Sequence, residues 1–175
     1  RAGTWGFAVP STCSGVTGDS GICFYVQSTG SDTGNFCIVA ANPCATGSHA
    51  AAVALKFDWE GGNAFVVDLD SGAWNDAESI AVNGLGRGSV NNSAIPNIGS
   101  LWPTMLIFDG NNQWTITGGG VVCYGIEAGN NAIVGVRRMT IAATGTACQD
   151  GLFAQFGGGF NVFDGMAFGA TGANG

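Results

Sequence analysis

Apolar and polar residues alternate along much of the chain, in short runs that are separated by Gly, Asn, Asp and Ser. A period of two is typical of a strand with one buried face, whereas an amphipathic helix repeats about every 3.6 residues. The clearest example is 51–70, "AAVALKFDWEGGNAFVVDLD", where two alternating runs flank the turn residues 61–63. The pattern predicts a β-hairpin with one core face and one acidic face.

A second hairpin is predicted over 104–117, "TMLIFDGNNQWTIT". Its apolar run 105–108 is followed by the turn residues 109–112, after which Trp114 and Ile116 alternate with threonines. Shorter runs of the same kind predict further strands at 4–9, 22–28, 36–41, 120–127 and 132–142.

Few segments have the features of a helix. Residues 75–84, "NDAESIAVNG", allow two helical turns, with Asn75 as the N-cap and Glu78 in the capping-box position. Residues 48–55, "SHAAAVAL", include good helix formers. Their alternation continues through 51–59, however, so we expect a strand there.

The C-terminal segment 151–169, "GLFAQFGGGFNVFDGMAFG", is rich in phenylalanine and has one ionisable side chain, Asp164. The phenylalanines are spaced like a helix face, but three glycines follow one another at 157–159. Each glycine inside a helix costs about 1 kcal/mol relative to alanine. The same residues also fit a period of two, so we expect one bent strand or two short strands with a change of direction at the glycines.

Together these runs predict an all-β protein, a disulfide-stabilised antiparallel β-sandwich or jelly roll of about ten short strands with at most one short helix. Strands do not alternate with helices, which argues against βαβ units. No repeat of fixed period and no linker is visible, so residues 1–175 are expected to form a single domain.

Charged residues make up only 10% of the chain, and the net charge is −7. Typical soluble domains have about 25%. The five lysines and arginines form no group larger than a pair, whereas nucleic acids and anionic membranes bind clustered positive charge. No run approaches the ~20 apolar residues of a membrane span. Neither nucleic acid binding nor membrane insertion is expected.

The chain has six cysteines and one histidine, His49. An even number of cysteines without a CxxC motif favours disulfides over a zinc site, and disulfides form in oxidising compartments. The chain begins with arginine rather than methionine, as a processed protein would. We therefore expect a secreted protein that is extracellular or at the cell surface. Pairing of near neighbours would join Cys13 to Cys23, Cys37 to Cys44 and Cys123 to Cys148, although other connectivities remain open.

Oxygen ligands for a hard cation are concentrated in 68–78, "DLDSGAWNDAE". Four carboxylates lie there, at Asp68, Asp70, Asp76 and Glu78. Calcium takes about six to eight oxygen ligands, so it is the one candidate cofactor, and the sequence requires none. A solvated acidic sheet edge is the alternative. A single histidine argues against a catalytic triad and against a zinc or copper centre.

Glycan chemistry has weaker candidates. Asp58 and Glu60 lie on one face of a predicted strand, at a separation compatible with the two carboxyl groups of a glycoside hydrolase. Trp74 and Trp102 lie near predicted turns and are candidates for stacking on sugar rings, with core packing as the alternative. The sequon 91–93 makes Asn91 a candidate glycosylation site.

Two hypotheses for the function follow. The first is a non-catalytic extracellular structural protein that self-assembles into a filament, fibril or surface layer, since charges are what usually keep sheet edges apart. Its partners are copies of itself, to which it could donate its C-terminal strand. The second is a secreted carbohydrate-binding module or carboxylate-dependent glycoside hydrolase, with extracellular glycans as partners. The pattern favours the first, with the assembly residues Phe153, Phe156, Phe160, Phe163 and Phe168.

Overall fold

The computed structural model describes residues 21–56, 63–83, 105–118, 124–142 and 150–169. They form twelve strands and one helix. In chain order these are β1 Gly21–Val26, α1 Gly47–Ala54, β2 Asn63–Asp68, β3 Trp74–Asp76, β4 Ile80–Asn83, β5 Leu106–Asp109, β6 Trp114–Ile116, β7 Tyr124–Gly129, β8 Ile133–Arg137, β9 Thr140–Ile141, β10 Asp150–Ala154, β11 Gly159–Val162 and β12 Ala167–Phe168.

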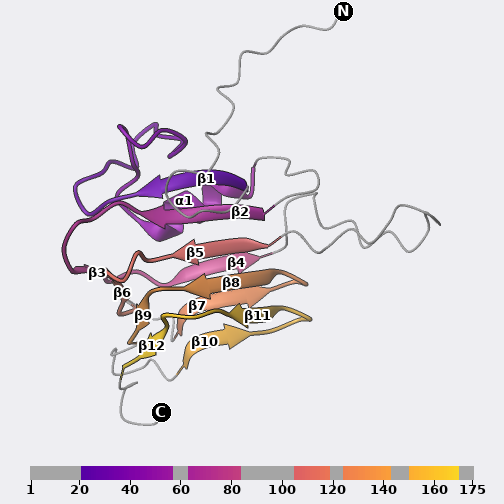
Figure 1. Cartoon of the computed structure of the whole chain (residues 1–175). Coiled ribbons are helices and arrows are strands. Elements are labelled where there is room, and N and C mark those ends of the chain that lie inside the picture. Colours follow the sequence, from indigo (N-terminus) through magenta and orange to yellow (C-terminus); the bar gives the residue numbers. More distant parts are fainter. Residues whose placement is uncertain (1–20, 57–62, 84–104, 119–123, 143–149, 170–175) are drawn as a thin grey trace, which may run out of the picture.

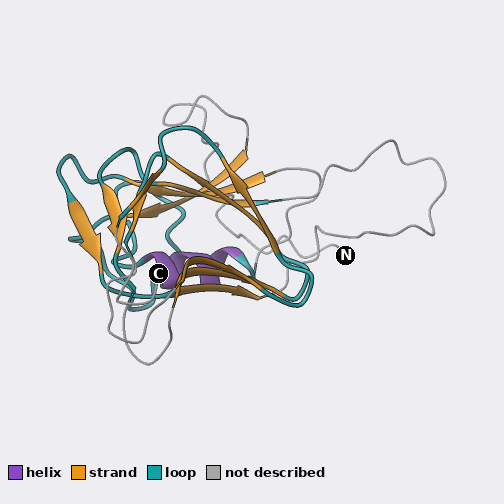
Figure 2. Ribbon diagram, turned by 90° about the horizontal axis from the view of Figure 1, so that it is seen from below, coloured by secondary structure: helices purple, strands orange, loops and turns teal. Residues whose placement is uncertain are grey.

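The strands form three sheets, with the orders β1-β2-β5-β8-β11, β10-β7-β4 and β12-β9-β6-β3. Every pair of neighbouring strands in these described sheets is parallel. Consecutive strands after β1 pass from one sheet to the next, so the chain winds in coils that stack on one another (Figure 1). Figure 2 shows the three sheets around a shared interior. The fold is a parallel β-solenoid.

The predicted antiparallel sandwich or jelly roll is therefore wrong, while the mostly-β content with one short helix is confirmed. Alternation identifies a strand with one buried face but does not identify the partner of that strand. Within 104–117, for example, β5 and β6 are strands as predicted. The turn between them leads β6 into a different sheet, and β5 pairs with β2 and β8 instead.

The helix forms where a strand was expected. Thr46 is the N-cap of α1, and its hydroxyl accepts a hydrogen bond from the backbone N–H of His49 at 3.2 Å. Helix α1 packs against β4, β1 and β2, and three of its four alanines, Ala50, Ala51 and Ala54, are buried in the core. Residues 57–62, which include the end of that predicted strand and most of the predicted turn 61–63, lie outside the described residues. The segment 75–84 allows a short helix by its sequence, but its described part, 75–83, contributes to β3 and β4, because pairing with β6 and β7 outweighs a weak local preference.

Side chains at equivalent positions of successive coils stack in columns through the interior. One column consists of Phe24, Val66, Phe108, Val136 and Val162. In parallel strands paired in register, equivalent side chains point to the same side of the sheet. Each apolar side chain of such a column is therefore followed by an apolar side chain of the next coil, and the core consists of these repeated layers.

The C-terminal segment changes direction at its three glycines, as predicted, since β10 ends before them and β11 begins at the last one. Gly157 has a φ of 79°, in the left-handed region. Gly158 lies so close to the preceding coil that a Cβ would collide with the carbonyl oxygen of Ala128. The glycines thus permit a turn that stacks directly on the preceding coil.

We expect Gly158→Ala to lower the free energy of unfolding by roughly 1–3 kcal/mol, because the new methyl group would push two coils apart. Gly159→Ala is the matched control, since the nearest atom to its Cβ would be Ile133 Cδ1 at 3.4 Å, an ordinary contact. Urea unfolding followed by tryptophan fluorescence measures both variants. Equal stability of the two variants would contradict the close packing of the coils.

Candidate functional site

The first pair of predicted calcium ligands lies at the end of β2. Asp70 accepts hydrogen bonds from the backbone N–H of Ser28 at 2.7 Å and from its hydroxyl at 2.8 Å. The backbone N–H of Asp70 in turn donates to Asp68 Oδ1 at 2.9 Å. The contacts of this pair connect the end of β2 to the chain that follows β1.

Asp68 is fully buried, and its Oδ2 has no hydrogen-bond partner among the described residues. Burial raises the pKa of Asp68 to about 7, opposed by the N–H of Asp70 and reinforced by the carboxylates of Asp70 and Asp109. Asp68 shares its side of the sheet with Ala64 and Val66, both of which belong to the core. The sequence placed it on an acidic face, but the structure turns it into the interior.

The second pair of predicted calcium ligands lies beside the N-terminus of α1. Asp76 Oδ2 accepts a hydrogen bond from the backbone N–H of Gly47 at 3.3 Å, and the hydroxyl of Ser48 donates to Glu78 Oε2. Burial raises the pKa of Asp76, and the N–H groups of Glu78 and Gly47 lower it. Negative charge is stabilising at this end of a helix. These contacts attach the N-terminus of α1 to β3 and the residues that follow it. Calcium binding by either pair stays a prediction.

A third charged group connects two neighbouring coils. It lies where β5 and β8 end, on the same side of the five-stranded sheet as the C-terminal end of β2. Asp109, at the end of β5, is fully buried. It accepts hydrogen bonds from Nε of Arg137 at 2.9 Å and from Nε and Nη2 of Arg138 at 2.8 and 2.6 Å. The guanidinium of Arg137 also lies 5.2 Å from the centre of the Phe65 ring. Asp109 was not a predicted site residue, although its position between an apolar run and a turn is visible in the sequence.

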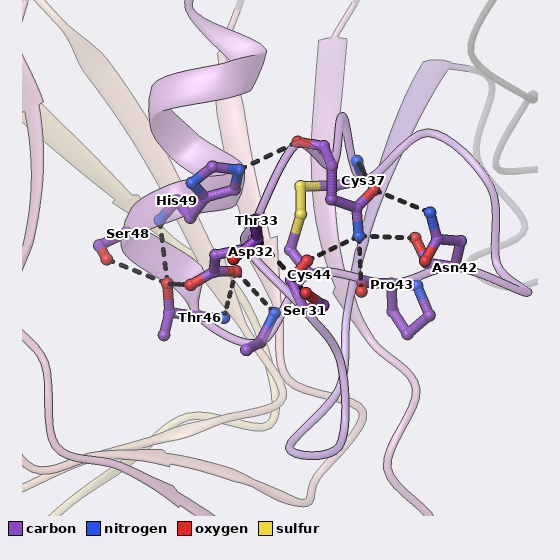
Figure 3. Close-up of a disulfide and its surroundings, with 12 residues drawn as sticks. Ser31, Asp32, Thr33, Cys37, Asn42, Pro43, Cys44, Thr46, Ser48 and His49 are labelled. Carbon is purple, nitrogen blue, oxygen red and sulfur yellow. Dashed lines mark hydrogen bonds between the residues drawn. A yellow bond between two sulfur atoms is a disulfide. The ribbon is translucent and has the colours of Figure 1, made fainter.

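The predicted Cys37–Cys44 disulfide is confirmed (Figure 3). Both cysteines are fully buried, and His49 lies beside them. The other two predicted pairings involve Cys13, Cys123 and Cys148, which lie outside the described residues.

The glycan candidates find no support among the described residues. Trp74 is 9% exposed and stacks on Trp114, with ring centres 5.0 Å apart, so it packs in the core. The remaining glycan candidates, Asp58, Glu60, Trp102 and Asn91, lie outside the described residues.

Four of the six large apolar side chains that are exposed in the described residues lie in the last coil of the solenoid, and the other two, Phe36 and Val39, lie in the segment that pairs with β1. In the last coil, β10, β11 and β12 are each the last strand of their sheet, and we call their free edges the open end. Val162 is 52% exposed, although Val136, its neighbour in the same column, is completely buried. Phe168 is 58% exposed above the fully buried Ile141. The open end therefore exposes the continuation of the hydrophobic core.

At the other end of the solenoid, described residues cover the edge strands of two of the three sheets. Helix α1 packs over β4, the first strand of the three-stranded sheet. The free edge of β1 is paired as well, since the N–H of Tyr25 donates to the carbonyl of Cys37 at 2.6 Å and the carbonyl of Tyr25 accepts from the N–H of Cys44 at 2.9 Å. The two ends therefore differ: α1 and the segment 37–44 lie over β4 and β1, whereas no described strand pairs with the outer edges of β10, β11 and β12 (Figure 1).

The predicted assembly residues have different environments. Phe156 is 74% exposed in the turn before β11, and Phe163 is 39% exposed. Phe153 stacks on Tyr124 with ring centres 5.9 Å apart, and Phe160 packs against the core. Val162 was not among the predicted assembly residues, although it belongs to the same alternating series as Phe156, Phe160 and Phe168. An aromatic count alone misses it, because its exposure depends on its position in a column.

The comparisons with known proteins identify no relative: no family model matches the chain, and neither a curated protein nor a solved structure matches it significantly. In the described part of the chain, no helix has the length and apolar character needed to cross a membrane.

Proposed function

We propose that this protein is a non-catalytic extracellular structural solenoid that associates with a second copy of itself through the open end. The observation that supports this most directly is the exposure of Val162 and Phe168, which extend two buried columns of the core. Contact with an apolar partner would remove this surface from water, at a gain of about 25 cal/mol per Å². The outer edges of β10, β11 and β12, which pair with no other described strand, add a second reason to associate.

The differing ends favour a particular arrangement. Head-to-tail stacking would require the open end of one copy to meet the end that α1 and the disulfide segment cover. Contact between two open ends avoids this, because the same surface is then used by both copies, as in a two-fold symmetric dimer. Such a contact closes on itself, so the basic unit is a pair rather than an unlimited stack.

Charge is compatible with this contact. Within 150–169 the ionisable side chains are Asp150 and Asp164, and both carry negative charge. Bringing two copies together costs some repulsion, which salt screens, while burial of apolar surface is not screened. We therefore expect association to persist or strengthen when the salt concentration is raised.

Val162→Lys tests the proposal, because it places a charge on the exposed end of a core column and edge lysines discourage strand association. We expect the wild-type chain to sediment as a dimer in analytical ultracentrifugation, and Val162→Lys to raise the dissociation constant at least tenfold. Val39→Lys is the matched control, since Val39 is equally exposed, at 51%, but lies in the segment that covers the other end. Its dissociation constant should equal that of the wild type.

Circular dichroism checks that both variants remain folded. A wild-type monomer at every concentration tested would contradict the proposal. So would a dimer that Val39→Lys weakens as much as Val162→Lys, because the contact would then not be at the open end.

A further inference from the structure

Three side chains with metal-binding atoms meet beside the N-terminus of α1. Atoms of Cys37, Cys44 and His49 that can bind a metal all lie within 4.8 Å of one another. In a tetrahedral zinc site, with bonds of about 2.3 Å to sulfur and about 2.0 Å to nitrogen, ligand atoms are roughly 3.5–3.8 Å apart. Small shifts would therefore bring these three atoms to zinc-binding distances once the two sulfurs are no longer bonded to each other.

The backbone holds the two cysteines together independently of the disulfide. Both are hydrogen-bonded to Tyr25, which donates to the carbonyl of Cys37 and accepts from the N–H of Cys44. The carbonyl of Cys44 also accepts from Gln27 N–H at 2.9 Å. After reduction, these contacts with β1 and its continuation would keep the two thiols next to each other.

The segment between the cysteines is fixed by Asn35, which is 92% buried. The two N–H groups of its side-chain amide are shared among the carbonyls of Ser31, Asn42 and Pro43, at 2.8, 3.1 and 2.8 Å from Nδ2, and its side-chain oxygen accepts from Cys37 N–H at 3.0 Å. The backbone carbonyl of Asn35 lies 3.0 Å from Nε2 of His49. The same residue therefore orders the segment and positions the imidazole.

The N-cap supports the histidine from the other side. Thr46 accepts a hydrogen bond from the N–H of His49, and its hydroxyl donates to Asp32 Oδ2 at 2.8 Å. Asp32 also accepts from the N–H of Ala45 at 2.7 Å. The backbone of the first turn of α1 thus has a fixed position relative to the cysteines, which reduces the cost of ordering a metal site.

We propose that Cys37, Cys44 and His49 form a zinc-binding site that the disulfide closes and reduction opens. Two equivalents of a thiol reductant break the Sγ–Sγ bond and are oxidised to their own disulfide, while each cysteine sulfur gains one electron and one proton. Both protons are released when the two thiolates bind Zn²⁺. One imidazole nitrogen supplies the third ligand, and water completes the four-coordinate site. Thiolate and imidazole ligands are those that zinc prefers.

Zinc binding by the full chain tests the proposal. The protein is reduced anaerobically with a phosphine, which is oxidised to its oxide and does not supply a competing thiolate. It is then titrated with Zn²⁺ and, in parallel, with Co²⁺, whose thiolate charge-transfer absorption reports sulfur ligation. The double variant Cys37→Ser/Cys44→Ser measures any binding by the remaining cysteines. We expect the wild type to bind one more ion per chain than this variant, and oxidised wild type to lose that ion.

His49→Gln is the second variant, because it keeps both thiols and can retain a hydrogen bond to Asn35. We expect it to weaken Zn²⁺ binding at least tenfold and to shift the cobalt spectrum. The proposal is overturned if the double variant binds as many ions as the wild type, or if His49→Gln binds with wild-type affinity and an unchanged cobalt spectrum. Circular dichroism of the reduced proteins checks that each remains folded. If the double variant does not fold, the zinc affinity and cobalt spectrum of His49→Gln test the proposal by themselves.

Discussion

Replacing Asp109 with alanine should lower the free energy of unfolding by about 3 kcal/mol, near the lower end of the roughly 3–5 kcal/mol that loss of one partner of a buried ion pair costs. The fully buried carboxylate binds the guanidinium groups of Arg137 and Arg138. Alanine would deprive both of their shared counter-charge. Their side chains are 18% and 33% exposed, so water can compensate in part.

Urea unfolding at neutral pH, followed by tryptophan fluorescence, measures this loss. Asp164→Asn is the control for removal of a negative charge, because Asp164 is exposed. Its backbone carbonyl, which the substitution retains, accepts the N–H of Arg138. We expect the control to stay within about 0.5 kcal/mol of the wild type. Similar losses in the two variants would show that net charge, rather than the buried pairing, matters at this position.

Replacing Asp68 with asparagine should stabilise the protein at pH 8 by roughly 2 kcal/mol and flatten its pH dependence. The pKa of Asp68 is about 7 in the folded protein, against an ordinary value of 3.8. Below about pH 4 the group is protonated in both states. Between about pH 4 and 7 only the folded state retains the proton, so the stability falls as the pH rises. Above pH 7 the full cost of burying the carboxylate remains.

The measurement is the difference in unfolding free energy between Asp68→Asn and the wild type at pH 4.5 and at pH 8, since other carboxylates contribute to both proteins. We expect the advantage of the variant to grow with pH over this range. Asparagine has nearly the same shape, carries no charge and keeps a side-chain oxygen that can accept from the N–H of Asp70. A difference that does not change with pH would contradict the shifted pKa.

The strands themselves could be predicted to a useful degree. The run at 22–28 includes all of β1 except Gly21, and the run at 132–142, expected as one strand, contains β8 and β9. The predicted change of direction at the three glycines separates β10 from β11. These features depend on neighbours in the sequence, namely side-chain alternation and the conformational freedom of glycine, so a single sequence reveals them.

The pairing of the strands could not be predicted in the same way. Residues that pair in successive coils have no common spacing: Tyr124 pairs with Asp150 about 26 residues later, whereas Ala64 pairs with Leu106 about 42 residues later. Unequal coil lengths hide the repeat that would otherwise identify a solenoid. Without that repeat, turn residues between two alternating runs fit a hairpin equally well.

The site residues show the same division. Near-neighbour spacing correctly predicted the Cys37–Cys44 disulfide. The four acidic residues at 68–78, in contrast, are close in sequence but belong to two different hydrogen-bonding groups, with Ser28 and with the N-terminus of α1. Both partners come from distant parts of the chain, so sequence proximity did not indicate them.

By itself the sequence determined that the chain is mostly β, poor in charge and able to form at least one disulfide, because these properties follow from composition and local pattern. Only the tertiary structure decided that the strands are parallel, that Asp68 faces the interior, and that Val162 and Phe168 lie at an open end. Each of these depends on which coil stacks on which. That choice is made by long-range burial and backbone pairing, to which many local patterns are equally suited.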